Sequence, residues 1–205
     1  MDSLCANKIA GQACLGGFEG EIIIYDVVGS TNDVAKDMAK AGCAHGTSVI
    51  ADKQTQGRGR YGKSFVSAEG VGIYMSVVLN ADIIGCGDPL NITMHAAVAV
   101  CESIEKVCQK NPRIKWINDV FLDAKKICGI LVETIDCENW VVGIGINFYA
   151  QDFKDGLEDI AGTLFEELPH ESIDRNILIA HIIKGLHEPI DDMAVKYKGR
   201  LIKGM

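Results

Sequence analysis

The segment from Gln54 to Ser64, QTQGRGRYGKS, gathers cationic side chains in an otherwise acidic chain. Its glycines at 57, 59 and 62 allow the backbone to bend and to approach a ligand closely. Arg58 and Arg60 can each form bidentate hydrogen bonds to a carboxylate or a phosphate. The sequence therefore predicts a mobile loop that closes over an anion formed during a reaction. A solvated surface loop, whose arginines balance nearby acids, is the alternative.

Two letter patterns within this loop are typical of other nucleotide sites. Residues 57–64 match G-x-x-x-x-G-K-[ST], the phosphate loop of nucleotide hydrolases and small kinases, and residues 57–62 match the dinucleotide fingerprint G-x-G-x-x-G. Both mechanisms need a helix that begins directly at the loop, so that its first amides face the phosphates. The sequence after Ser64, FVSAEGVG, contains two glycines and does not favour a helix. We expect neither pattern to be functional.

The elements around the loop follow from the periodicity of apolar residues. Short β-branched or alternating runs predict strands, and longer amphipathic runs predict helices. We expect strands at about 21–27, 47–52, 71–79, 113–116, 126–134 and 140–146, and helices at about 31–41, 90–110 and 173–186. Asn118 and Asp119 are expected to turn the chain between strands. This order favours the α+β class, with a mixed, largely antiparallel sheet and helices packed on one face.

Composition and charge limit the kind of protein. With 205 residues and 48% hydrophobic side chains, the chain is predicted to form one domain over 21–205, preceded by an N-terminal extension at 1–20. The net charge of −8 argues against a general nucleic-acid binder. No signal peptide and no apolar run long enough for a membrane span are visible, so a cytoplasmic protein without membrane contact is expected.

Metal binding by the protein itself is not expected. The chain has eight cysteines and five histidines, but they show no C-x-x-C pair and no spacing typical of zinc ligands. We interpret the cysteines as small buried side chains in a reducing compartment.

Five blocks of this sequence, taken together, resemble the catalytic domain of biotin protein ligases. They occur in that family's order and at about its intervals, over roughly residues 21 to 150. The blocks are GSTN at 29–32, Q-x-x-GRGR-x-G at 54–62, KWIND at 115–119, K-x-x-GILVE at 126–133 and GIGIN at 143–147. Lipoate ligases and octanoyl transferases share the general fold but resemble the chain less at the GRGR and KWIND blocks.

The resemblance implies a two-step reaction that uses biotin, ATP and Mg²⁺. The biotin carboxylate attacks the α-phosphate of ATP, which gives biotinyl-adenylate and pyrophosphate. A lysine of a biotin carboxyl carrier protein, such as that of acetyl-CoA carboxylase, then attacks the mixed anhydride. The resemblance also implies site residues. The biotin site would comprise Ser30, Thr31, Asn32, Gln54, Arg58, Gly59, Arg60 and Lys126, the nucleotide site Arg58, Arg60, Phe65 and Lys126, and the catalytic group Lys126, Arg58 and Arg60.

The chemistry of these residue types agrees with those roles. Cations are needed to bring a carboxylate and a polyphosphate together, and Lys126 could stabilise charge at the attacked phosphorus. A cyclic urea needs a few fixed polar partners in an apolar pocket. Simpler interpretations stay open at this point: Ser30 and Thr31 could only cap a helix, and Lys126 could be a surface lysine.

Family members that repress transcription carry an N-terminal helix-turn-helix domain, and most members end in a small β domain. We expect this chain to lack the first and to have the second absent or truncated, so no DNA binding is expected, and a homodimer is possible. Three other functions remain as alternatives: a lipoyl- or octanoyl-type acyltransferase on the same fold, a non-catalytic biotin-binding module, and a small kinase with a phosphate loop.

Overall fold

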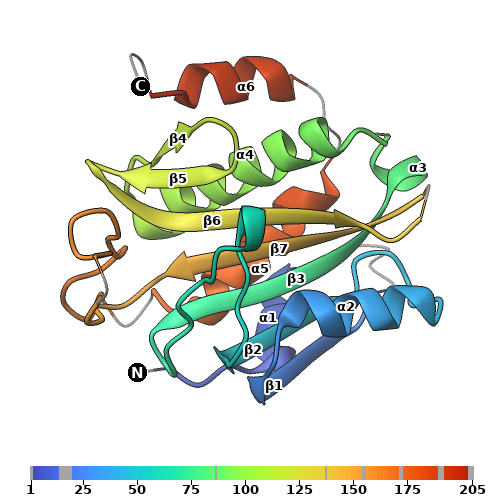
Figure 1. Ribbon diagram of the computed structural model, residues 1–205, viewed down its shortest axis with the longest axis horizontal. Helices are drawn as coiled ribbons and strands as arrows, with labels where there is room; N and C mark the ends of the chain where they lie inside the picture. The colour runs from blue at the N-terminus through green and yellow to red at the C-terminus, as the bar shows by residue number, and fades with distance from the viewer. Residues whose placement is uncertain are drawn as a thin grey trace.

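The computed structural model describes residues 2–13, 20–85, 87–136, 138–153, 156–170, 173–188 and 192–202. A seven-stranded sheet forms its centre, in the order β1-β2-β3-β7-β6-β5-β4 (Figure 1). The strands are β1 (Ile22–Val28), β2 (Ser48–Gln54), β3 (Gly72–Asn80), β4 (Arg113–Lys115), β5 (Asp119–Leu122), β6 (Lys125–Thr134) and β7 (Asn139–Asn147). Among these strands β1 and β2 pair in parallel and the other neighbours are antiparallel. The predicted mixed, largely antiparallel sheet is confirmed.

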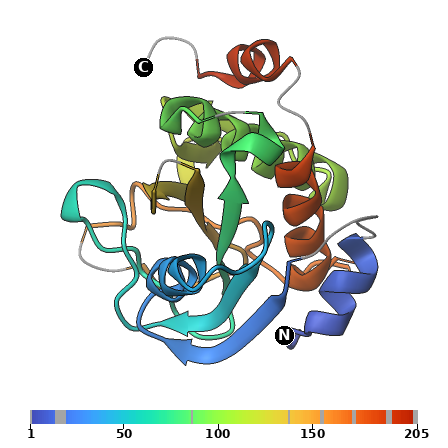
Figure 2. The same cartoon turned by 90° about the vertical axis from the view of Figure 1, so that its right-hand side faces the viewer.

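Helices cover both faces of this sheet. They are α1 (Ala6–Ala13), α2 (Thr31–Lys40), α3 (Ala81–Ile84), α4 (Pro89–Cys108), α5 (Arg175–His187) and α6 (Met193–Arg200). The two views in Figures 1 and 2 place α1, α4 and α5 behind the sheet and α2 in front, beside the loop at 57–65. The prediction of helices on one face therefore holds for α1, α4 and α5, and α2 departs from it.

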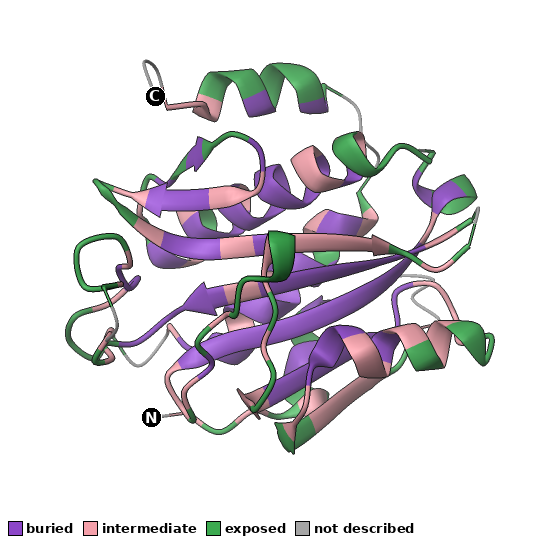
Figure 3. Cartoon of the chain, viewed as in Figure 1, coloured by how far each residue is buried: buried purple, intermediate pink, exposed green. Residues whose placement is uncertain are grey.

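The burial of the central strands explains why both faces need cover. Residues 72–79 of β3 are all buried, and successive side chains of a strand point to opposite faces (Figure 3). On one face, Met75 and Val77 belong to the main core with α4 and α5. On the other, Val78 packs with Ala35 of α2 in a separate smaller cluster. Removing apolar area from water on both faces stabilises this three-layer arrangement.

Four elements lie where the sequence analysis expected none, and one of them is α3, a single helical turn directly after β3. Residues 6–13 of the expected N-terminal extension form α1, and Ile9 is fully buried in the main core. The expectation that Asn118 and Asp119 both turn the chain is wrong for Asp119, which begins β5. The strand escaped notice because it is only four residues long and follows the turn directly. Helix α6, with its short apolar face, packs against α4 and β4.

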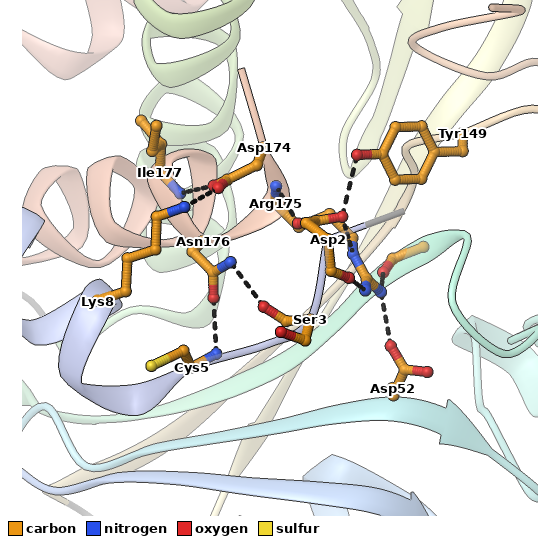
Figure 4. Close-up of polar contacts among 11 residues, drawn as sticks. Asp2, Ser3, Cys5, Lys8, Asp52, Tyr149, Asp174, Arg175, Asn176 and Ile177 are labelled. Atoms are coloured by element: carbon orange, nitrogen blue, oxygen red, sulfur yellow. Dashed lines mark hydrogen bonds and ion pairs between the residues drawn. The ribbon is translucent and has the colours of Figure 1, made fainter. Parts of the chain in front are cut away.

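The N-terminal segment is bound to the start of α5 through a buried arginine (Figure 4). Arg175 donates to Asp2 Oδ1 at 3.1 Å, to Asp52 Oδ1 at 2.7 Å and to the Gly72 carbonyl at 3.1 Å. Its backbone N–H donates to Asp2 Oδ2 at 2.8 Å. We call Asp2, Asp52, Gly72 and Arg175 the Arg175 cluster. It joins the N-terminal segment, β2, β3 and α5, because a buried guanidinium needs several acceptors.

No helix in the described ranges is both long and apolar enough to cross a bilayer.

Cys101, Cys108 and Cys128 are buried free thiols, as interpreted, whereas Cys5 is exposed. Burial raises the pKa of Cys101 and of Cys108 to about 12, so these thiols are poor nucleophiles. Cys14, Cys86 and Cys137 lie outside the described residues.

Candidate active site

An open cavity of about 500 Å³ is lined by residues of α2, of the central strands β3, β6 and β7, and of the loop at 57–65, which we call the glycine–arginine loop. All of the site residues expected from the sequence line it: Ser30, Thr31, Asn32, Gln54, Arg58, Gly59, Arg60, Phe65 and Lys126. The fold therefore brings together residues that are up to 96 positions apart in the sequence, from Ser30 to Lys126.

Glycines on β7 form part of the cavity floor. A Cβ atom at Gly143 would lie 2.0 Å from Asn32 Oδ1, and one at Gly145 would lie 2.7 Å from the Phe65 ring. Side chains at these positions would push α2 and Phe65 away from the sheet. The glycines of the GIGIN block are therefore explained by steric fit, because the absence of side chains at these positions lets polar and aromatic groups approach the sheet closely.

The start of α2 is joined to the end of β2 by hydrogen bonds. Thr31 donates to Gln54 Oε1 from its backbone nitrogen at 2.8 Å, and its Oγ1 lies 3.1 Å from the same oxygen. Gln54 Nε2 donates to Ser67 Oγ at 3.0 Å. Ser30 is the N-cap residue of α2, but its side chain makes no capping hydrogen bond. The Ser30 hydroxyl therefore does not cap the helix. The Thr31 hydroxyl takes part in the polar network that lines the cavity.

This network continues to residues that the sequence analysis did not select. Asn32 Nδ2 donates to Glu133 Oε2 of β6 at 2.7 Å, and Asn32 Oδ1 lies 2.6 Å from Ser76 Oγ of β3. Ser76 Oγ also lies 2.7 Å from Thr31 Oγ1. Burial raises the pKa of Glu133, but hydrogen bonds from Asn32 and Lys36 outweigh burial, so the pKa lies below its ordinary value. A lone serine within the apolar run IYMSVVL was the signal for Ser76.

The glycine–arginine loop folds back on itself as a short hairpin. Gly59 N–H donates to the Lys63 carbonyl at 2.7 Å, and Phe65 N–H donates to the Gly57 carbonyl at 2.9 Å. Residues 63–71 are all described, and no helix begins among them before β3. The phosphate-loop and dinucleotide patterns therefore lack the helix their mechanisms need, as the sequence analysis expected.

The two loop arginines are held by different elements of the fold. Arg58 donates to Asp33 Oδ1 of α2 at 2.5 Å and lies 3.6 Å from Glu133 Oε2. Arg60 donates to Asn118 Oδ1 at 3.1 Å. Burial raises the pKa of Asp33, but hydrogen bonds from Lys36 and Arg58 lower it more, and the result lies below 3.8. Asn118 thus both turns the chain and contacts the loop.

Lys126 lies between this cavity and a second one. Its Nζ lies 2.7 Å from Asp119 Oδ1 at the start of β5. The second cavity, of about 490 Å³, has a largely apolar lining of Ser64, Phe65, Val66, Lys126, Cys128, Asn147, Phe153, Leu157, Ile160 and Ala161. Lys126 and Phe65 line both cavities. An elongated ligand with one polar end and one flat apolar end could therefore pass Lys126 at its middle.

The described residues contain no group of three or more His, Cys, Asp or Glu side chains arranged to hold a metal ion. The first cavity is lined by three cationic side chains, Arg58, Arg60 and Lys126.

Comparison with known proteins gives consistent matches. The model of the biotin/lipoate A/B protein ligase family matches residues 24–147. The bifunctional ligase/repressor BirA of Bacillus spizizenii is 43% identical over 171 residues, which cover 80% of this chain and 52% of that protein. The chain spans about half the length of the curated relatives it matches first.

Solved structures agree. The biotin protein ligase of Aquifex aeolicus, in complex with biotin and ATP, is 28% identical, with a TM-score of 0.77 over 90% of this chain and 79% of that one. The biotin protein ligase of Leishmania major, in complex with biotinyl-5-AMP, is 25% identical, with a TM-score of 0.66 over 90% and 82%.

Proposed function

Since this chain belongs to the biotin/lipoate A/B protein ligase family, we propose that it activates biotin with ATP and transfers it to a lysine of a biotin carboxyl carrier protein. The observation that carries the proposal is the pair of cavities that meet at Lys126 and Phe65. One is lined by polar groups suited to a cyclic urea, and the other by apolar groups suited to a purine ring. One solved structure supports the choice of ligands: the similar Aquifex aeolicus protein was solved with biotin and ATP.

The first step joins the two substrates at the meeting point of the cavities. A carboxylate oxygen of biotin forms a bond to the α-phosphorus of ATP, and the bond from that phosphorus to the pyrophosphate oxygen breaks. Negative charge gathers at this point, where Lys126 Nζ would lie close to it. One well-placed donor to developing charge is commonly worth about 3 kcal/mol in the transition state. Lys126 is therefore assigned the main catalytic role, with Asp119 holding its Nζ in place at 2.7 Å.

The loop arginines serve the product of this step. Biotinyl-adenylate is a mixed anhydride that water or any amine can attack, so the enzyme must shield it. Arg58 and Arg60 lie on a hairpin above the cavity, and they can exchange Asp33 and Asn118 for the adenylate phosphate. Phe65, which lines both cavities, would stack on the adenine ring.

The second step attaches biotin to the carrier and releases AMP. The lysine nitrogen of the carrier attacks the anhydride carbonyl carbon, the bond from that carbon to the AMP oxygen breaks, and the amine loses a proton.

Magnesium would neutralise phosphate charge and would arrive with ATP, because this ion commonly keeps several waters and binds through substrate phosphates. The expected carrier, the expected lack of DNA binding and the possible homodimer stay predictions.

One experiment separates the proposed function from its alternatives. Protein is mixed with ATP, magnesium and one acid, pyrophosphate release is followed, and the acyl-adenylate is identified by its mass. We expect pyrophosphate release when the acid is biotin, and none when it is lipoate or octanoate. Release with lipoate or octanoate but not biotin would support the acyltransferase alternative. Biotin binding without any pyrophosphate release would identify a binding module instead.

A further inference from the structure

Two cations and two carboxylates meet beside the first cavity, where α2 lies next to β6. Lys36 Nζ lies 3.1 Å from Asp33 Oδ1 and 2.9 Å from Glu133 Oε1. Arg58 donates to the same Asp33 oxygen at 2.5 Å and lies 3.6 Å from Glu133 Oε2. We call Asp33, Lys36, Arg58 and Glu133 the charge cluster. Burial tends to raise the pKa of both acids, but their hydrogen bonds lower it more, so both are ionised near neutral pH.

The fold holds the two cations with different firmness. Lys36 belongs to α2, and its side chain is 20% exposed. The helix is fixed against the sheet by Ala35, which is fully buried. Arg58 belongs to the glycine–arginine loop and is the one residue of the charge cluster that lines the first cavity. Arg58 is therefore the cation that can leave, whereas Lys36 stays with both carboxylates.

The departure of Arg58 would be unfavourable without Lys36. In the proposed function Arg58 contacts the phosphate of biotinyl-adenylate, and each contact that Arg58 makes in the free protein competes with that one. If no other cation were present, two neighbouring carboxylates would be left unpaired and would repel each other. Lys36 already contacts both, so it neutralises them when Arg58 leaves.

We propose that Lys36 is a positioning residue that frees Arg58 for the phosphate of biotinyl-adenylate, and that Asp33 opposes it by holding Arg58 in the free protein. The proposal rests on the proposed function and deepens it. Lys36 does not need to touch the ligand, because it acts on the free energy that Arg58 loses when it leaves its carboxylate partners. Two neighbours on one helix are therefore expected to affect the retention of the intermediate with opposite signs.

The first experiment measures how fast synthetic biotinyl-adenylate dissociates, so it does not depend on whether a variant can make the intermediate. Lys36→Gln should release it about threefold faster than wild type, because Arg58 then leaves two carboxylates without a cation. Asp33→Asn should release it about threefold more slowly, because Arg58 loses its nearer carboxylate in the free protein. If Lys36→Gln does not fold, Lys36→Met replaces it, because methionine keeps the apolar part of the side chain.

Lys40→Gln and Asp37→Asn are the matched controls, because Asp37 and Lys40 form a similar pair further along α2. Neither control should change the release rate by more than about twofold. A merely structural role would make every destabilised variant release the intermediate faster. Asp33→Asn is expected to destabilise the protein slightly and yet to hold the intermediate longer. Faster release from Asp33→Asn, or an unchanged rate in Lys36→Gln, would overturn the proposal.

A double-mutant cycle separates action through Arg58 from a direct effect of charge on the phosphate. In an Arg58→Met background, adding Lys36→Gln should change the release rate by less than about twofold. An equal effect of Lys36→Gln with and without Arg58 would mean that the lysine attracts the phosphate directly, and the proposal would be wrong although the proposed function still stood. Failure of the wild type to bind biotinyl-adenylate at all would instead overturn the proposed function itself.

Discussion

Arg175 and Arg58 each pair with two carboxylates, in very different surroundings. The Arg175 side chain is 2% exposed and pairs with Asp2 and Asp52. The Arg58 side chain is 41% exposed and pairs with Asp33 and lies near Glu133. Separating a buried pair leaves an uncompensated charge, whereas water readily replaces the partner of an exposed one. An arginine–carboxylate ion pair therefore stabilises the fold in the Arg175 cluster, whereas at the site it is a contact that Arg58 can release.

The largest expected effect is on folding stability. Arg175→Met should lower the free energy of unfolding by about 3 kcal/mol or more, because it leaves two carboxylates with no cation. Arg58→Met should lower it by less than about 1 kcal/mol. Urea denaturation of both variants under the same conditions measures the difference. Equal losses would contradict the contrast between the two arginines.

Lys126 pairs with Asp119 at intermediate exposure, and its replacement sharpens the comparison by separating stability from catalysis. Lys126→Ala should reduce the rate of adenylate formation at least about 100-fold, the equivalent of about 3 kcal/mol. The free energy of unfolding should change by less than about 1 kcal/mol. Single-turnover formation of biotinyl-adenylate measures the rate. A rate near that of wild type would remove Lys126 from its catalytic role.

Arg60→Gly tests whether a loop arginine retains the intermediate. Arg60 can give up its contact with Asn118. Closure of the loop over the adenylate should therefore depend on the charge-assisted hydrogen bonds that Arg60 forms with the adenylate instead. The variant should still form adenylate but release it faster, by about tenfold for each 1.4 kcal/mol lost. The dissociation rate of biotinyl-adenylate and the labelling of an unrelated lysine-rich protein are the readouts. Tight retention without stray labelling would show that Arg60 has no part in shielding.

The smallest effect is expected at Asp33. Its folded pKa is lower than the ordinary value of 3.8, so its stabilising contribution is present above that value and is lost as the pH falls through the folded pKa. Asp33→Asn should therefore cost less than about 1 kcal/mol at neutral pH, and the difference from wild type should shrink as the pH falls below 3.8 and through the folded pKa. Urea midpoints measured at neutral pH and at a series of acidic pH values test this. A difference that grows in acid would have the wrong sign.

The sequence predicted which residues would line one cavity better than it predicted the elements around them. The loop residues and Lys126 carry charge in recognisable blocks, and the structure gathers them around one cavity. Ser76 stands out in the sequence only as a lone serine in an apolar run, and its contacts with Thr31 and Asn32 could not be predicted, because they come from the pairing of β3 with its neighbours and from the approach of α2. Helix α1 was missed for a related reason: Ile9 becomes a core residue only once α5 lies beside it.

The bonds between the N-terminal segment and α5 have a consequence for the order of folding. Asp2 and Ser3 contact Arg175 and Asn176 across 173 positions of sequence. Closing a loop of that length lowers the entropy of the chain before stabilising contacts can compensate the loss. These hydrogen bonds are therefore expected to form after the more local strand pairs. During synthesis the segment at 2–8 must wait until residues 174–176 have been made. Helix α1 and the start of α5 are therefore expected to open together, which hydrogen exchange at both places would register as one event.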